Sequence, residues 1–236
     1  MKKVLLLSFA FAAGTVAVQA QNIQLHYDFG SALYKDLSKS TDPPGRPALT
    51  TTVEHFVADK WGSTFFFVDM DYQGGTVASA YWEIARELTF WQGPITAHIE
   101  YNGGLNYIND AYLAGATYTY NSFDFSKGYS LSLLYKGLRN TVDRNGKSHP
   151  HSFQITGVWH LAIDGGLYDF TGFIDFWKER DFIFLSEPQF WVNLNKIKAF
   201  DDKFNLSVGT EVEVSNNFAG RDGFYVIPTL AAKWHF

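Results

Sequence analysis

Apolar and polar residues alternate along most of the sequence. Residues 65–71 read FFFVDMD, and an extended chain places successive side chains on opposite faces. One face of this segment then carries Phe66, Val68 and Met70, whereas the other carries Phe65, Phe67, Asp69 and Asp71. The pattern predicts a strand that separates an apolar environment from a polar one.

Segments of this kind recur to the end of the chain, bounded by clusters of Gly, Asn, Asp, Pro or Lys. We expect twelve strands, at about 22–30, 48–58, 61–72, 79–91, 95–105, 110–120, 129–139, 151–161, 167–178, 181–193, 203–214 and 223–236. Long connections are expected at 41–47, 71–79, 138–150 and 215–223, and short ones at 58–60, 92–94 and 163–166, with 196–203 as a long exception. This alternation is typical of an even-stranded barrel with both termini on one side.

The first twenty residues have a different character. Lys2 and Lys3 precede an apolar run from Val4 to Val18, which predicts a secretory signal peptide cleaved after Ala20. Residues 21–236 contain no apolar stretch of the roughly 20 residues that a spanning helix needs, so the membrane structure left open is a β-barrel. We predict an all-β fold, a transmembrane antiparallel β-barrel of about twelve strands, as one domain over 21–236 in the cell outer membrane.

Composition narrows the chemistry. Aromatic residues make up 18% of the chain, and cysteine is absent, which excludes disulfides, thiol catalysis and cysteine-bound metals. A formal net charge of −5 argues against nucleic acid as a partner. We predict no cofactor and no metal. The last segment alternates apolar residues up to Phe236, a pattern typical of recognition by the barrel-assembly machinery; a soluble strand ending in Phe is the alternative.

If the apolar face contacts lipid, the carboxylates face the lumen. Arg86 and His55 fall on the outward face, which predicts either a position near the interface or a β-bulge. Inward aromatic rings can stack on a planar base for about 1–3 kcal/mol, and carboxylates can accept hydrogen bonds from hydroxyl groups. The candidate binding residues in the lumen are Glu54, Phe65, Phe67, Asp69, Asp71, Glu83, Glu100, Asp175, Trp177, Glu187 and Glu211. The alternative is that these acids pair with the few lysines and water and only stabilise the barrel.

Two longer stretches resemble a known family. EHFVADKWGSTFFFVDMDYQGG at 54–75 and YWEIARELTF at 81–90 resemble the nucleoside-specific channel-forming (Tsx-like) outer-membrane proteins, with weaker similarity at 107–115 and 170–176. The resemblance implies a twelve-stranded barrel with a narrow pore for nucleosides. It places Glu54, Asp69 and Glu83 at the family's acidic positions, whereas residues 85–87 depart from its pattern.

The expected function is therefore a monomeric channel for passive uptake of small neutral solutes, with nucleosides favoured by the resemblance. A non-conducting structural or adhesion barrel and a lipid-modifying enzyme remain alternatives. His149, His151 and Ser152 can suggest a metal site or a hydrolase pair, although solvated loop histidines explain them more simply. Paired carboxylates can serve glycoside hydrolysis, but any polar lumen shows the same alternation. We predict no enzymatic activity.

Overall fold

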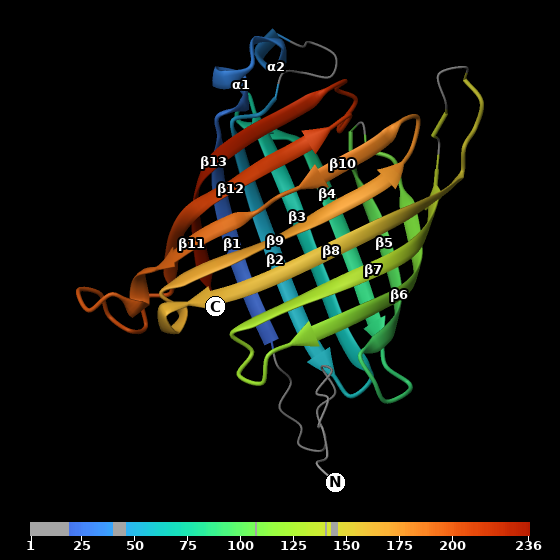
Figure 1. Cartoon of the computed structure of the whole chain (residues 1–236). Coiled ribbons are helices and arrows are strands. Elements are labelled where there is room, and N and C mark those ends of the chain that lie inside the picture. Colours follow the sequence, from blue (N-terminus) through green and yellow to red (C-terminus); the bar gives the residue numbers. More distant parts are fainter. Residues whose placement is uncertain (1–18, 40–45, 107, 140, 143–145) are drawn as a thin grey trace.

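The computed structural model describes residues 19–39, 46–106, 108–139, 141–142 and 146–236, which form one closed antiparallel sheet (Figure 1). Its strands are β1 (Gln19–Asp28), β2 (Leu49–Asp59), β3 (Gly62–Gln73), β4 (Thr76–Leu88), β5 (Ile95–Leu105), β6 (Ala111–Asn121), β7 (Lys127–Leu138), β8 (His151–Ile163), β9 (Tyr168–Lys178), β10 (Phe182–Ser186), β11 (Gln189–Asn193), β12 (Leu206–Asn216) and β13 (Phe224–His235). Within these residues, the connections hold the short helices α1 (Gly30–Leu33) and α2 (Lys35–Lys39) and two 3-10 turns, Asp164–Gly166 and Leu194–Lys196. None of the described helices has the length and apolar character needed to cross a membrane.

Strand pairing closes the sheet into a ring. β1 pairs with β2 on one side and with β13 on the other. β10 and β11 each pair with both β9 and β12, so these two short strands share one position in the ring. The thirteen strands of the described residues therefore occupy twelve positions. The predicted twelve-stranded antiparallel barrel is confirmed.

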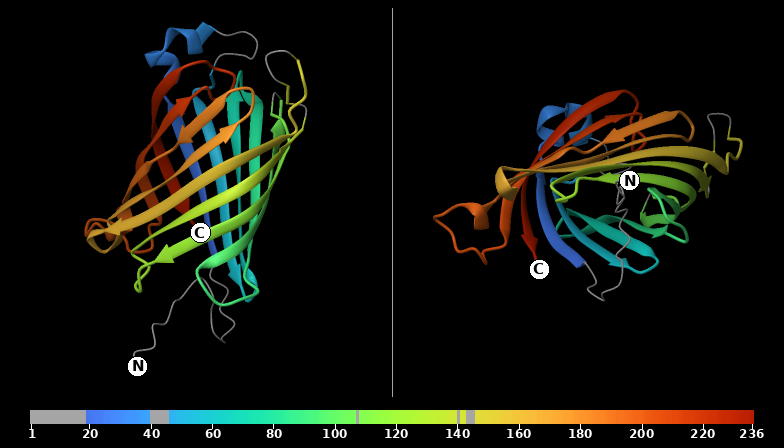
Figure 2. Two further views of the ribbon diagram at one scale, coloured as in Figure 1. Left: turned by 45° about the vertical axis from the view of Figure 1, so that its right-hand side comes forward. Right: turned by 60° about the horizontal axis from the view of Figure 1, so that its bottom comes forward.

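The two ends of the barrel differ. The start of β1 and the C-terminus lie toward one end, which we call the terminal end, whereas α1 and α2 lie at the opposite end, the loop end (Figures 1 and 2). The strands of the two walls, β1–β4 and β8–β11, cross at a steep angle in Figure 1. Closing a sheet into a barrel requires this kind of tilt.

Register fixes which side chains of neighbouring strands share a face. Asp69 lies opposite Thr52 and Asp71 opposite Thr50, on the same face as the other lumen residues. Outward apolar side chains remain exposed in the isolated chain: Ile99 is 51%, Leu133 60% and Leu230 63% exposed. An exterior of this character suits lipid rather than water.

The two outward residues that break the pattern have separate explanations. Arg86 donates to Asp59 at 2.8 Å and to Thr64 at 3.0 Å, near the terminal end of the barrel. The β2–β3 pairing runs without a shift, and the shift in β3–β4 lies at Asp71/Tyr72, remote from Arg86. His55 lies on the ring of Phe66, with centroids 5.3 Å apart. Arg86 can face outward because it lies near the rim of the barrel, and not because a bulge shifts the register of its strand.

The expected strand at 181–193 is broken in two. Pro188 has no N–H to donate to a neighbouring strand, so the ladder ends at Ser186 and resumes at Gln189. The Glu187 amide still donates to the carbonyl of Phe173 at 3.1 Å. Gly172, with φ of +152°, allows the close approach, because an added Cβ would lie 2.7 Å from the Glu187 carbonyl oxygen. The proline was visible in the sequence, and the continuous strand was a wrong expectation.

A second expectation was also wrong. Residues 71–79 were expected to form a long connection, yet β3 and β4 extend to Gln73 and Thr76 and leave only Gly74 and Gly75 between them. Both glycines have positive φ, +61° and +81°, as a tight hairpin turn of the mirror-image type requires. Asp71 and Tyr72 are therefore part of the barrel wall and not of a surface loop.

The interior is not uniformly acidic. Ala111, Leu113, Leu134 and Leu138 form a buried apolar cluster on the inward faces of β6 and β7. A second cluster joins Trp177, Ile183 and Leu185. Apolar side chains thus fill part of the lumen, as expected where a narrow barrel brings inward side chains into contact. The predicted signal peptide falls almost wholly outside the described residues and stays a prediction.

Candidate lumen binding site

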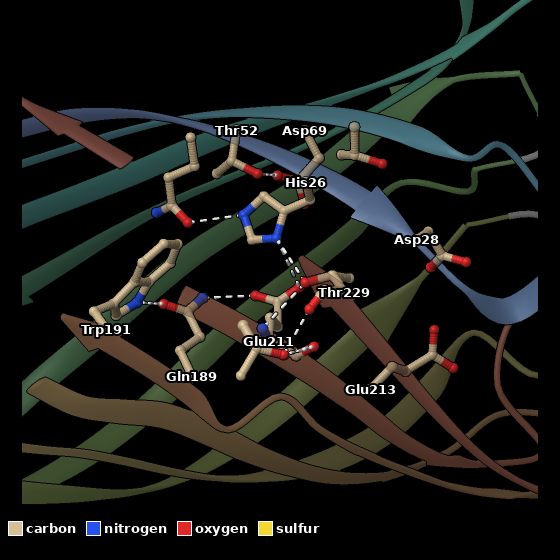
Figure 3. A network of polar contacts seen from close by, with 12 residues as sticks. His26, Asp28, Thr52, Asp69, Gln189, Trp191, Glu211, Glu213 and Thr229 are labelled. Carbon is tan, nitrogen blue, oxygen red and sulfur yellow. Dashed lines mark hydrogen bonds and ion pairs between the residues drawn. The ribbon is translucent and has the colours of Figure 1, made fainter. Parts of the chain in front are cut away.

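One group of lumen residues is built around His26, on the inward face of β1 (Figure 3). Its ring nitrogens contact Thr229 Oγ1 at 3.3 Å and Gln24 Oε1 at 2.9 Å. Glu211 lies 3.8 Å from the ring and accepts a hydrogen bond of 2.6 Å from Gln189. We call Gln24, His26, Gln189, Trp191, Glu211 and Thr229 the His26 network. It joins strands from the beginning and the end of the chain across the seam that closes the barrel.

Most of the carboxylates predicted around this network have hydroxyl or amide partners. Asp69 accepts from Thr52 at 2.5 Å, and Glu54 accepts from Asn22 at 2.8 Å. Asp71 accepts from both Thr50 and Ser79, each at 2.7 Å. Glu187, at the break between β10 and β11, interacts electrostatically with Asp69 and Glu211. The short polar partners on adjacent strands were not identified from the sequence.

Nearer the loop end, arginine neutralises two further carboxylates. Arg46 contacts Asp28 and Glu213 at 2.8 Å each, and Arg221 contacts Glu213 at 2.7 Å. The side chains of Asp28 and Glu213 are only 7% and 6% exposed. Burial lowers the pKa of Arg46, but Glu213 and Asp28 outweigh it, so its pKa lies above the ordinary value. We call Asp28, Arg46, Glu213 and Arg221 the loop-end cluster.

The loop-end cluster holds the β1–β2 connection against the barrel. The Gly30 amide donates to Asp28 at 2.6 Å, and the Arg46 amide donates to the carbonyl of Leu37 at 3.0 Å. On the other side, the Tyr225 hydroxyl donates to Asp36 at 2.7 Å, which lowers the pKa of Asp36. Leu37 is buried. Charge and packing therefore dock α1 and α2 on the loop end.

A different arrangement joins residues of the neighbouring strands β4 and β5 with a residue of β9, which is not adjacent to them in the sheet. We define the acid site as Glu83, Glu100, Asn102 and Asp175. Glu83 is the direct cross-strand neighbour of Asn102, and its charge interacts with those of Glu100 and Asp175. Glu83 accepts from Tyr81 at 3.0 Å, and Asp175 accepts from Thr156 at 2.5 Å. No Lys, Arg or His nitrogen of the described residues lies within 4.0 Å of Glu83 or Asp175.

Two buried lysines lie on the faces of tryptophan rings. Lys136 Nζ is 4.4 Å from the centroid of Trp177 and donates to Gln154 at 2.7 Å. Lys233 Nζ is 4.0 Å from the centroid of Trp191. The ring face attracts a cation electrostatically, and the attraction is larger where water is excluded. Trp177, a predicted site residue, thus holds an internal ammonium group instead of a free stacking face.

His98 bridges two carboxylates on the same inward face. Its Nδ1 lies 2.6 Å from Glu87 and its Nε2 3.0 Å from Glu100. An imidazole with carboxylate oxygens at both nitrogens can satisfy both only as a donor at each, which is the charged form. Glu100 is therefore paired through one oxygen only.

The residues predicted for the lumen therefore fall into two groups. Glu54, Asp69, Asp71, Glu187 and Glu211 gather near the His26 network, whereas Glu83, Glu100, Asp175 and Trp177 come from β4, β5 and β9. Phe65 and Phe67 lie between them, 6.0 Å apart, and Phe67 contacts Tyr81 at 5.6 Å. Sequence reasoning missed Arg46, Gln24 and His26 as lumen residues. The strict alternation of β1 could have identified Gln24 and His26.

The residues considered for enzymatic chemistry have other partners. The Ser152 hydroxyl donates to the carbonyl of Lys178, and His151 Nδ1 lies 2.5 Å from the Tyr135 hydroxyl. On β3, the neighbouring carboxylates Asp69 and Asp71 contact different hydroxyl groups. Among the described residues, no group of three or more acids, histidines or cysteines has the arrangement of a metal site.

Comparison with solved structures agrees with the barrel. The KdgM porin aligns with a TM-score of 0.54 and 11% identity over 93% of this chain and 99% of that one. The NanC porin aligns with a TM-score of 0.58 and 9% identity over 92% of this chain and 100% of that one. A KdgM porin in complex with disordered oligogalacturonate gives the same values as KdgM alone. At these identities the likeness concerns the fold alone.

The fold is thus that of the outer-membrane porin barrels, with a lumen rich in carboxylates. The chain belongs to the family DUF5020, described as a domain of unknown function, whose model matches residues 20–236. No curated protein sequence was found to match it. These findings do not show membership of the Tsx-like family, whose motifs the sequence resembles.

Proposed function

We propose that this protein is an outer-membrane channel that conducts small hydrophilic solutes by passive diffusion. The observation that carries the proposal is the contrast between the two surfaces of the barrel. Charged and polar side chains face the lumen on nearly every strand, whereas exposed Ile, Leu, Phe and Tyr face outward. A polar interior enclosed by an apolar exterior is what an aqueous pathway through lipid requires. The porin-like fold supports the same function.

The solute proposed from the sequence resemblance is a nucleoside. Phe65 and Phe67 offer inward rings, and carboxylates such as Glu54 and Asp69 offer acceptors for ribose hydroxyl groups. Repeated weak sites of this kind favour transit, because a solute that binds too tightly leaves slowly. We further propose that the chain is exported by its signal peptide, is assembled through the segment ending in Phe236, and works as a monomer.

One observation favours a second candidate, a barrel that does not conduct. Arg46 inserts between Asp28 and Glu213 at the loop end, and the β1–β2 connection docks above it. The buried apolar cluster around Leu113 and Leu134 also occupies part of the lumen. Both features stabilise the barrel and narrow its lumen, which suits a structural or adhesion protein that has no need of an aqueous pathway.

Single-channel recording separates the two candidates. Purified protein without residues 1–20 is reconstituted in a planar bilayer, and its folding is checked by the slower gel migration of the heated form. Stepwise currents support the channel, and their interruption by adenosine or thymidine supports nucleosides as solutes. A correctly folded protein that gives no current steps at any applied voltage contradicts the channel. Current steps that nucleosides leave unchanged contradict the nucleoside assignment only.

A further inference from the structure

We propose that the acid site binds the ammonium group of an amine-bearing solute. This inference deepens the proposed function, on which it rests for the route by which a solute arrives. Glu83, Glu100 and Asp175 place three carboxylates on facing inward walls. The binding of one cationic group would relieve their mutual repulsion, and a neutral or anionic solute would not.

The acid site has acceptor oxygens that the protein leaves without donors. Within the described residues, Glu100 Oε1 and Asn102 Oδ1 are buried and have no hydrogen-bond partner. The side chain of Glu100 is 6% exposed and Asn102 is 5% exposed. Such unpaired buried acceptors are costly, typically about 1–3 kcal/mol each. A ligand that brings N–H donors would satisfy them, and an ammonium group carries three.

The site is open to the lumen on one side. Glu83 and Asp175 retain partial exposure, so a solute in the pore can reach them before it contacts the more buried Glu100 and Asn102. Tyr81 and Phe67 lie on the same inward face, with ring centroids 5.6 Å apart. Carboxylates next to aromatic rings form an environment suited to organic cations.

The protein already stabilises ammonium groups in this way. Lys136 Nζ lies over Trp177, and its charge interacts with Glu83, Glu100 and Asp175. Yet no ion pair within 4.0 Å joins Lys136 to any of the three, because its hydrogen bond goes to Gln154. Lys136, together with His98 shared between Glu87 and Glu100, leaves a surplus of carboxylate at the site. Lys233 over Trp191 repeats the arrangement on the opposite side.

A bare metal ion fits less well than an organic cation. The described residues contain no group of three or more acids, histidines or cysteines with the spacing of a metal site. Carboxylates spread over three strands suit a larger ligand with several donors. A solute with one or two primary amines and a short carbon chain carries the opposite charge and is long enough to contact acceptors on more than one strand.

The test compares two probes of equal length in the reconstituted barrel, 1,4-diaminobutane and 1,4-butanediol. We expect the diamine to interrupt the current at concentrations at least tenfold below those of the diol. The double variant Glu83→Gln/Glu100→Gln should raise the half-blocking concentration about tenfold, the loss expected for a charge-assisted hydrogen bond. Asn102→Asp adds a carboxylate and should lower it.

Asp169→Asn is the matched control. Asp169 faces the same lumen from β9 and accepts a hydrogen bond from Asn193 at 2.7 Å, but it lies outside the acid site. Its replacement removes one charge, as Glu83→Gln alone does, and should change the half-blocking concentration less than about twofold. Equal shifts in Asp169→Asn and Glu83→Gln would mean that the diamine senses only the overall charge of the lumen, which would overturn the site.

Calorimetry on the detergent-solubilised barrel separates this inference from the proposed function. Diamine binding that is lost in Glu83→Gln but retained in Asp169→Asn supports the acid site even if no current is observed, and in that case only the channel fails. Conducting pores in which the diamine and the diol act alike overturn the acid site and leave the channel standing. If the double variant does not fold, two single variants test the acid site instead. Glu83→Gln should weaken diamine binding and Asn102→Asp should strengthen it, and the absence of these opposite effects would overturn the site.

Discussion

The loop-end cluster and the acid site contain the same kinds of residue in opposite electrostatic situations. At the loop end, Asp28 and Glu213 each lie 2.8 Å from Arg46. In the acid site, Glu83 accepts a hydrogen bond from Tyr81 and Asp175 one from Thr156, and within the described residues no ion pair within 4.0 Å joins either carboxylate to a cation. Breaking a buried ion pair costs far more than its formation contributes, so paired carboxylates hold a structure together. Carboxylates that lack a paired cation can instead gain free energy by binding a cationic ligand.

The largest effect is expected from Arg46→Ala. This variant would remove the distinction, because it takes away the main cation that compensates the carboxylates of the loop-end cluster. Asp28 and Glu213 would be left buried, with Arg221 as their remaining cation. We expect the free energy of unfolding to fall by about 3–5 kcal/mol. Urea titration of the detergent-folded barrel, followed by tryptophan fluorescence, measures the change. Trypsin should also cleave faster after Lys35 if the β1–β2 connection loses its attachment.

Arg180→Ala is the control for Arg46→Ala. Arg180 also contacts two acids, Asp181 and Asp222, but its side chain is 46% exposed. Exposed ion pairs contribute about 0–1 kcal/mol, so this variant should unfold nearly as the parent does. Equal losses in the two variants would show that burial of the loop-end cluster does not matter. Its role as the attachment of the connection would then be wrong.

The sequence predicts the carboxylates of the acid site and does not predict the loop-end cluster. Alternation placed Glu83, Glu100 and Asp175 on the inward face, because strand period is a local property of the chain. Arg46 lies in a proline-rich connection with no period, and its partners are 18 and 167 positions away in the sequence. Only the closed barrel brings them together. The break at Pro188 was readable from the residue itself, whereas Lys136 over Trp177 depends on pairing through β8.

The next largest effect should come from Lys136→Met, which sharpens the contrast by removing the lysine near the acid site. Loss of the contact with Trp177 and of the partial compensation should lower the free energy of unfolding by about 1–2 kcal/mol. The same variant should bind 1,4-diaminobutane more tightly. Lys127→Met, at the exposed start of β7, is the control and should change stability within about 0.5 kcal/mol. Weaker diamine binding in Lys136→Met would contradict the claim that the acid site holds more carboxylates than cations.

Glu83→Gln should shift stability in the opposite direction. The amide can still accept the hydrogen bond of Tyr81, but it removes one of three mutually repelling charges. We expect the free energy of unfolding to stay constant or to rise by up to about 1 kcal/mol, while diamine binding weakens. Combined with Lys136→Met, it should recover part of the lost stability, a coupling that a double-mutant cycle measures. A clear loss of stability in Glu83→Gln alone would place this residue with the structural carboxylates.

The smallest effect belongs to Tyr225→Phe, at the outer edge of the loop end. Its hydroxyl donates to the exposed carboxylate of Asp36 and lowers the pKa of that group below the ordinary value of about 3.8. A depressed carboxylate pKa stabilises the docked connection above this value and loses that contribution as the pH falls through the folded pKa. Water competes for an exposed carboxylate, so trypsin cleavage after Lys35 at pH 8 should accelerate less than about twofold. An acceleration as large as that in Arg46→Ala would show that the tyrosine, and not the buried arginine, holds the connection on the barrel.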